Sequence, residues 1–252
     1  MSANLLQTLL ERGRRGNPVI AAHRGASARA PENTLAGFLA ALDDGAEMVE
    51  LDVHLSADGR LAVIHDETTE RTTGVRGVVA EMTMARLHEL DAARFMGKAW
   101  AGQPVPELGE VLDAVRGRLL VNVEIKGPPE TAPVLAQRLD EHEMRQSVIV
   151  SSFDPHAVAA ATTLQPPLLA GLLLDGPIDD PVAVAGAAGA SLVHVAYPYI
   201  TADLARRTHQ AGLGLVAWTV NEPSEMLRLR SLGVDAIISD DPRLLRDTLA
   251  GA

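Results

Sequence analysis

The stretch VIAAHRGASARAPENTLAGFLAALDDGAEMVELDVHL, residues 19–55, has the pattern of one strand–helix–strand unit. Its two ends are short apolar runs that suit strands of a buried parallel sheet. The apolar residues expected on one face of the helix between them are Leu35, Phe38, Leu39 and Leu42. Asn33 is its predicted N-cap, and Gly45 its predicted stop. The stretch therefore predicts two parallel strands joined by a helical crossover.

The same alternation of apolar runs with Leu/Ala-rich helical stretches continues along the chain. The runs are VIAAH, MVELDVHLS, LAVIHD, LLVNVEIK, SVIVSSF, LLAGLLLD, SLVHVAY, LGLVAWTV and DAIISD. Repetition of strand and helix over 252 residues predicts an α/β fold, a (β/α)8 TIM barrel, because such barrels commonly need about 250 residues.

Nine runs for eight barrel positions leave one strand to explain. The loop SADGR, residues 56–60, is too short for a parallel crossover, so the runs on either side of it should form an antiparallel hairpin. Residues from about 67 to 106 then lack the β/α rhythm, and we expect an insertion there at the mouth of the barrel. The chain, 1–252, is otherwise expected to be a single domain.

Composition excludes several classes of protein. A net charge of -11 argues against a nucleic-acid partner and against stable association with an anionic membrane. The absence of cysteine excludes disulfides and thiolate metal sites. The first residues have their apolar part before their basic part, the reverse of a secretory signal. A cytoplasmic protein is expected, and its oligomeric state stays open.

Charged residues occur within two of the predicted strands, where apolar residues would be expected. Glu50 and Asp52 are two positions apart, and Asn122, Glu124 and Lys126 share the same spacing, so each set points to one face. Their apolar neighbours must face the helices, which places the charged face inside the barrel. Three carboxylates at close range repel one another, and a hard divalent cation relieves that repulsion. An all-oxygen set favours Mg²⁺ or Ca²⁺ over zinc.

The alternative interpretation of these carboxylates is an internal salt-bridge network with Lys126 and Arg24. Two histidines, His23 and His65, weigh against it, because each ends a predicted strand near the carboxylates. Together with an anion-binding Arg24 they compose a phosphate site. Gly25 is expected to let the backbone pass close to the ligand.

The ordered set HRG, PENT, ELDVHLSADG, VIHDETTERTTG, VEIK, WTVN and DAIISDDP resembles the glycerophosphodiester phosphodiesterase family over nearly the whole chain. The resemblance implies a (β/α)8 barrel with a small insertion after the HD motif. It also implies metal-dependent hydrolysis of glycerophosphodiesters to glycerol 3-phosphate and an alcohol. The implied metal ligands are Glu50, Asp52 and Glu124, and the implied acid/base pair is His23 and His65. Arg24 and Lys126 then hold the phosphate.

Three further positions are candidates for substrate contact. Trp218 and Asn221 follow a late strand and could border the glycerol moiety, although Asn221 could equally cap the next helix. Phe153 could form a wall of the pocket or simply pack at the top of the barrel. His54, His194 and His209 are interpreted as structural.

Two other classes of protein compete with this prediction. A metabolite-binding barrel without activity should lack an acid/base or metal residue, and none is missing. A lipid-active relative should show an apolar or basic membrane-facing surface, whereas this chain is acidic and only 3% aromatic. The sequence leaves open which alcohol leaves, which histidine is the acid, and whether water or the glycerol 2-hydroxyl attacks phosphorus.

Overall fold

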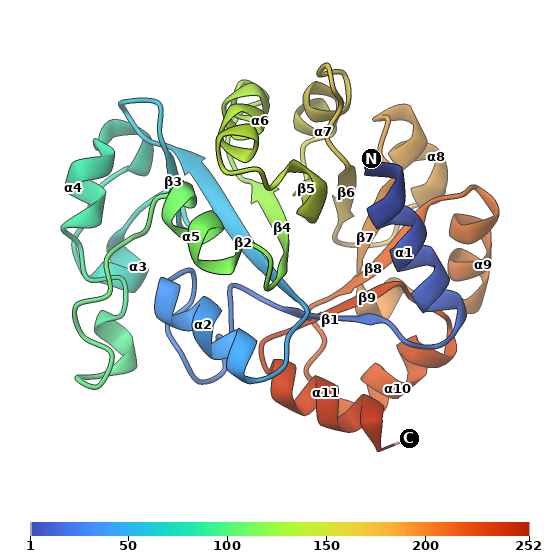
Figure 1. The fold of residues 1–252 in the computed structure, drawn as a ribbon. Helices are drawn as coiled ribbons and strands as arrows, with labels where there is room; N and C mark the ends of the chain where they lie inside the picture. The colour runs from blue at the N-terminus through green and yellow to red at the C-terminus, as the bar shows by residue number, and fades with distance from the viewer. Residues whose placement is uncertain (1, 252) are drawn as a thin grey trace.

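The strands form a closed barrel, as the sequence predicts. The computed structural model describes residues 2–251, with the side chains of residues 2–4 and 6 left aside. Eight parallel strands form a ring in which β1 pairs with both β2 and β9 (Figure 1). They are β1 Val19–Ala22, β2 Met48–Leu55, β4 Leu120–Ile125, β5 Val148–Ser152, β6 Ala170–Leu174, β7 Leu192–Ala196, β8 Gly214–Trp218 and β9 Ala236–Ser239. The prediction of a (β/α)8 TIM barrel is confirmed.

Helices cover the outside of this ring. They are α2 Leu35–Asp43, α5 Leu108–Val115, α6 Thr131–Glu141, α7 Pro155–Thr162, α8 Pro181–Ala187, α9 Ala202–Gln210, α10 Pro223–Ser231 and α11 Pro242–Ala250, with the short η3 Arg145–Ser147 and η4 Tyr197–Tyr199. Helices α7, α8 and α11 begin alike: an aspartate caps the first turn and proline follows it. The outward residues of β2 and β4 are buried in the main core against the helices, as predicted.

Helix α2 differs from its prediction in two respects. Its N-cap is Thr34, whose Oγ1 accepts from Gly37 N at 3.1 Å, and not Asn33. Leu39 is exposed, because the face turned to the core is made of Phe38 with small residues that allow close approach. A Cβ at Gly37 would lie 2.4 Å from Pro31 O, so this close approach fixes the rotation of the helix.

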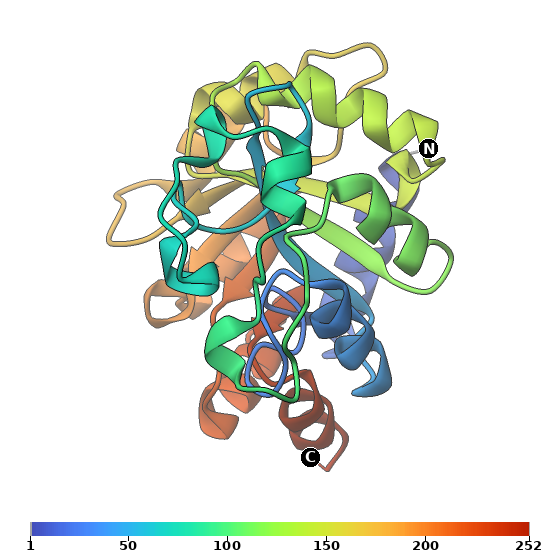
Figure 2. The same cartoon turned by 90° about the vertical axis from the view of Figure 1, so that its left-hand side faces the viewer.

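The ninth strand is β3, Leu61–Val63, which pairs with β2 in antiparallel register as the short loop predicts. It leads into residues 64–107, a segment of short elements: α3 Glu70–Thr73, η1 Val79–Glu81, α4 Met84–His88 and η2 Arg94–Met96. This segment has a small apolar cluster of its own. In Figure 2 it lies in front of the strands. The predicted division into one domain with an insertion at 67–106 stays a prediction.

Helix α1, Ser2–Arg14, closes the amino-terminal end of the barrel. Leu5 and Leu9 of this helix pack against inward residues at the start of the strands, among them Met48, Ile149 and Leu192. The barrel is therefore closed at this end, and its opposite end is left for a ligand. Within residues 2–251, no helix combines the length and the apolar character needed to cross a membrane.

Candidate active site and its acidic cluster

A pocket of about 180 Å³ lies among residues at and beyond the carboxyl ends of the barrel strands. Eight of the ten predicted site residues line it: His23, Arg24, Glu50, His65, Glu124, Lys126, Phe153 and Trp218. Of the other two, Asp52 is buried beside the pocket, and Asn221 lines a neighbouring hollow that shares His23 and Arg24 with it. The predicted residues therefore come from strands far apart in sequence to one end of the barrel.

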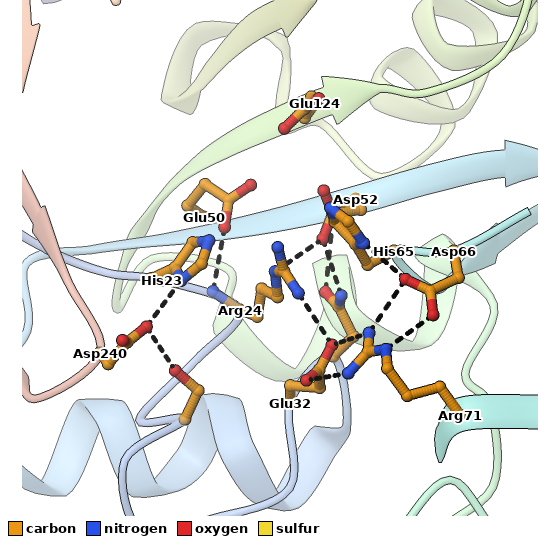
Figure 3. A network of polar contacts seen from close by, with 12 residues as sticks. His23, Arg24, Glu32, Glu50, Asp52, His65, Asp66, Arg71, Glu124 and Asp240 are labelled. Atoms are coloured by element: carbon orange, nitrogen blue, oxygen red, sulfur yellow. Dashed lines mark hydrogen bonds and ion pairs between the residues drawn. The ribbon is translucent and has the colours of Figure 1, made fainter. Parts of the chain in front are cut away.

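Three carboxylates form the acidic cluster of this site. Glu50 and Asp52 lie on β2, and the register of the neighbouring β4 sets Glu124 opposite Asp52. All three residues are buried, and one oxygen from each can be chosen so that the three lie within 4.8 Å of one another. The shared inward face predicted from the spacing is thus present (Figure 3).

Burial and mutual repulsion shift the pKa values of these carboxyls. Burial, followed by the charges of Asp52 and Glu124, raises the pKa of Glu50 well above its ordinary value. Burial and the Asp52 charge likewise raise the pKa of Glu124 to about 7. Burial also acts to raise the pKa of Asp52, but Lys126 and Arg24 outweigh it and the net shift is downward. The cluster cannot hold three full negative charges comfortably without further positive charge.

Two cations already lie beside the cluster. Lys126 Nζ is 2.7 Å from Glu124 Oε1 and 3.4 Å from Asp52 Oδ1, and Arg24 Nε is 3.4 Å from Asp52 Oδ2. The predicted alternative, a salt-bridge network with Lys126 and Arg24, is therefore partly present. These two positive charges can neutralise only two of the three carboxylates when all three are ionised. The atoms of the cluster that could bind a metal ion are all carboxylate oxygens. One of them, Asp52 Oδ1, accepts no hydrogen bond from the described residues. Such a set fits a hard divalent cation.

The loop after β1 holds Arg24 in an unusual backbone conformation. Its φ is 54°, and its backbone N donates to Glu50 Oε2 at 2.9 Å. Gly25 follows with φ 88°, and a Cβ there would lie 2.6 Å from the backbone of Gly37. Helix α2 therefore requires glycine at position 25, and the close approach of a ligand to Gly25 stays a prediction. Asn33 is not a cap, since its Nδ2 donates to Asp52 Oδ2 at 2.8 Å.

His23 is held by a carboxylate that directly follows the last strand of the barrel. Its Nδ1 lies 2.6 Å from Asp240 Oδ1, which also accepts from Ser27 Oγ. Asn221 Nδ2 donates to the other oxygen of Asp240 at 2.6 Å, and Asn221 Oδ1 accepts from Asp240 N and Ser239 Oγ. Asn221 therefore orients Asp240, whereas the cap of α10 is Glu222. Burial acts to raise the pKa of Asp240, but the hydrogen bond and charge of His23, together with the hydrogen bonds from Asn221 and Ser27, outweigh it and the pKa falls to about 2.

His65 has the same arrangement with a different partner. Its Nδ1 lies 2.7 Å from Asp66 Oδ1, and Arg71 donates to both oxygens of Asp66. The hydrogen bond from Arg71 is the main cause that lowers the pKa of Asp66 to about 2. Burial, opposed by the charge of Asp52, lowers the pKa of His65. Each histidine thus has its Nδ1 fixed by an ionised carboxylate, which leaves Nε2 free for chemistry.

Two aromatic side chains line the pocket together with Lys126. Phe153 and Trp218 make an edge-to-face contact with ring centroids 5.6 Å apart, and Lys126 Nζ lies 5.8 Å from the Phe153 centroid. Phe153 is 44% exposed, so it does not fill the core, and its contact with a ligand stays a prediction.

The three histidines interpreted as structural, His54, His194 and His209, do not line this pocket. His54 Nε2 lies 3.0 Å from the carbonyl of His65, and His209 pairs with the buried Asp235. His194 is fully enclosed in the barrel, and burial lowers its pKa to about 3.

No role in the site was predicted from the sequence for several residues that contact the site residues. These are Glu32, Asn33, Asp66, Arg71 and Asp240. All five lie within the motifs PENT, VIHDETTERTTG and DAIISDDP. Strand alternation could not find them because they lie outside the strands, four in loops and Arg71 in the short helix α3. Asp175, which also lines the pocket, follows β6 with no distinguishing signal.

Comparison with known proteins agrees with this geometry. A family model described as the glycerophosphoryl diester phosphodiesterase family matches residues 23–244. A glycerophosphodiester phosphodiesterase of Caldanaerobacter subterraneus subsp. tengcongensis is 37% identical over 232 residues, which cover 90% of this chain and 96% of that protein.

Solved structures give the same result. One is an Oleispira antarctica phosphodiesterase in complex with the product sn-glycerol-3-phosphate, with a TM-score of 0.86, 28% identity and coverage of 92% of this chain and 97% of that one. Another is a glycerophosphodiester phosphodiesterase from Agrobacterium tumefaciens, with a TM-score of 0.82, 30% identity and coverage of 91% and 99%. From its matched length, its fold and its relatives, this chain belongs to the glycerophosphoryl diester phosphodiesterase family of enzymes.

Proposed function

We propose that this protein hydrolyses glycerophosphodiesters to glycerol 3-phosphate and an alcohol, with a divalent cation and a pair of histidines. One observation carries the proposal: His23 and His65, each with Nδ1 beside a carboxylate, line the same pocket as two members of the acidic cluster. A phosphodiester needs positive charge at its oxygens and a proton donor for its leaving oxygen, and this pocket provides groups for both.

The cation would be held by Glu50, Asp52 and Glu124, with Mg²⁺ or Ca²⁺ favoured by the oxygen ligands. When bound, it would supply positive charge to the phosphate oxygens and favour loss of a proton from a nearby hydroxyl. Counting side chains alone, the cluster with Arg24 and Lys126 carries one net negative charge. A divalent cation would make that sum positive, as an anionic substrate requires.

Arg24 and Lys126 are the proposed phosphate contacts. Arg24 Nη1 donates to Glu32 Oε1 at 3.0 Å, whereas its buried Nε has no hydrogen-bond acceptor among the described residues. Lys126 lines the pocket beside Glu124. Arg24 and Lys126 are thus each held by a carboxylate. Both also line the pocket, where they could contact a bound phosphate.

The two histidines would divide the proton transfers. The attacking hydroxyl loses its proton to one Nε2, the P–O bond to the alcohol breaks, and the leaving oxygen takes a proton from the other Nε2. Asp66 and Asp240 would stabilise whichever imidazole becomes positively charged, because both are ionised at neutral pH. The same pair serves direct attack by water or prior attack by the glycerol 2-hydroxyl.

The proposed partner is a small glycerophosphodiester, with its glycerol moiety against Phe153 and Trp218. The acidic composition supports this choice over nucleic acid and over stable membrane association. A cytoplasmic location stays a prediction.

The test is an assay of purified protein against a panel of glycerophosphodiesters after chelation, with each metal added back. His23→Ala and His65→Ala should each lose most of the rate on alkyl diesters while still binding metal and glycerol 3-phosphate. A nitrophenyl diester, whose leaving group needs no proton, should restore activity only to the variant that lacks the acid. Full turnover in metal-free protein, or normal alkyl-diester rates in both variants, would refute the proposal.

A further inference from the structure

Arg71 lies outside the barrel, on the short helix α3, yet it contacts two carboxylates of the site at once. Its Nε donates to Asp66 Oδ2 at 2.6 Å, and its Nη1 donates to Glu32 Oε2 at 2.8 Å. Its Nη2 donates to both residues, at 3.1 Å to Asp66 Oδ1 and at 2.7 Å to Glu32 Oε1. One guanidinium therefore makes a bidentate contact with each carboxylate (Figure 3).

Each of these carboxylates holds a different residue of the proposed mechanism. Asp66 Oδ1 lies 2.7 Å from Nδ1 of His65, and Glu32 Oε1 accepts from Nη1 of Arg24 at 3.0 Å. Arg24 in turn lies beside Asp52 of the acidic cluster. The contacts thus form one continuous chain from a proposed acid/base residue to a proposed phosphate contact, with Arg71 in the middle.

The backbone around Arg71 is fixed by two buried threonines. Thr69 Oγ1 donates to Val75 O, and Thr73 Oγ1 donates to Thr69 O at 2.7 Å. Gly74, with φ 71°, ends the helix directly after them. The motif ERTTG therefore builds a rigid single turn that presents Arg71 to the site, although Arg71 itself is half exposed.

We propose that Arg71 is a positioning residue, which sets the orientation of His65 through Asp66 and of Arg24 through Glu32. This proposal rests on the proposed function for the roles of His65 and Arg24. Segment 64–107 then completes the active site rather than only flanking it, because it supplies the one cation that contacts both Asp66 and Glu32 among the described residues.

Arg71 can hold both residues in place because Asp66 and Glu32 share its one positive charge. Without Arg71, and counting partners among the described residues, Asp66 keeps only the imidazole of His65 and Glu32 keeps only Arg24. The two carboxylates then repel each other. Asp66 can then rotate away from His65, and Arg24 can follow Glu32 away from the pocket. A lysine has no planar fork and can satisfy one carboxylate but not both.

The primary variant is Arg71→Gln, with Arg71→Lys as the conservative variant and Arg86→Gln as the matched control. Arg86 lies in the same segment, and its side chain forms a surface ion pair with Glu89. We expect kcat on an alkyl diester to fall roughly 10- to 100-fold in Arg71→Gln, as for partners that orient active-site ligands, with Arg71→Lys between it and wild type. Arg86→Gln should keep the wild-type rate.

Single variants of Asp66 and Glu32 separate the effect of Arg71 on His65 from its effect on Arg24. Asp66→Asn should lower kcat, and Glu32→Gln should weaken binding of glycerol 3-phosphate to the metal-loaded protein by calorimetry. Arg71→Gln should do both. Adding Arg71→Gln to Asp66→Asn should lower kcat by less than about threefold more, because residues that act as a unit are not additive. The proposal would be overturned if the double variant lost kcat by the product of the two single losses. It would also be overturned if Arg71→Gln bound glycerol 3-phosphate as tightly as the wild type.

A spectroscopic readout keeps this test separate from the proposed activity. Long-range ¹H–¹⁵N spectra of the neutral imidazole should show His65 protonated on Nδ1 in the wild type and a mixture of tautomers in Arg71→Gln. The same spectrum in both would overturn the positioning role even if kcat falls. If the wild type hydrolyses no diester, the proposed function fails, while the spectra still decide whether Arg71 orients His65.

Discussion

Asp240→Asn removes the negative charge beside His23 and changes the side-chain shape very little. Asp240 accepts from His23 Nδ1 at 2.6 Å, from Ser27 Oγ at 3.0 Å and from Asn221 Nδ2 at 2.6 Å. In the variant, the remaining oxygen can still accept from His23 and Ser27, but the new amide group then faces the amide of Asn221 as a second donor. We expect His23 to keep its tautomer and to lose the charge that stabilises its protonated form.

The effect on catalysis follows from the kind of bond that is lost. A hydrogen bond to a charged group contributes about 1.5 to 3 kcal/mol. At about 1.36 kcal/mol per factor of ten, kcat should fall roughly 10- to 150-fold. Metal affinity should stay unchanged, since Asp240 lies on the far side of His23 from the acidic cluster in Figure 3.

The effect on stability follows from the pKa of Asp240. A fall from the ordinary value of 3.8 to about 2 corresponds to an upper bound of about 2.4 kcal/mol at about 1.36 kcal/mol per pH unit. The side chain is 34% exposed, so solvent screening reduces this to the order of 1 kcal/mol. Because the pKa is depressed, this stability is fully present above pH 3.8 and is lost as the pH falls towards 2.

The assays are steady-state kinetics on an alkyl diester and urea unfolding at pH 7 and at low pH. The matched control is Asp241→Asn, where asparagine can still cap helix α11 in place of the aspartate that accepts from Leu244 N. A kcat within about threefold of wild type for Asp240→Asn, given folded protein and normal metal binding, would refute the role of Asp240.

Glu124→Gln should weaken Mg²⁺ binding at least tenfold by calorimetry without lowering the thermal midpoint of the metal-free protein, because burial and then repulsion by Asp52 already raise the pKa of Glu124; unchanged affinity would contradict the metal site. Gly25→Ala should cost more than about 1 kcal/mol in urea unfolding, because alanine at φ 88° is strained and its Cβ would meet helix α2; normal stability would be inconsistent with this contact. Leu9→Ala should cost about 3 to 5 kcal/mol with kcat unchanged in folded protein, because Leu9 is fully buried at the end opposite the pocket; a loss well below that range would show that α1 does not close the barrel.

Most of the barrel could be predicted because strand and helix periodicities are local. Alternation along β2 and β4 separated Glu50, Asp52 and Glu124 from their outward apolar neighbours, and the structure places them so. Which face of α2 turns to the core could not be predicted from its apolar residues alone. The small residues Gly37 and Ala40 lie on the buried face and let the helix backbone approach its neighbours closely. Because this face is turned to the core, the larger Leu39 is left exposed.

The sequence by itself determined that parallel strands alternate with helices, and that carboxylates, histidines and cations gather at the carboxyl end of the strands. Both follow from side-chain direction, which depends only on neighbouring residues in the chain. Only the tertiary structure decided which carboxylate holds which histidine: Asp240 reaches His23 across 217 positions, and Arg71 reaches Glu32 across 39. These contacts exist because closure of the ring sets β9 beside β1 and places residues 64–107 beside the loop after β1, and no local pattern encodes which loops then meet.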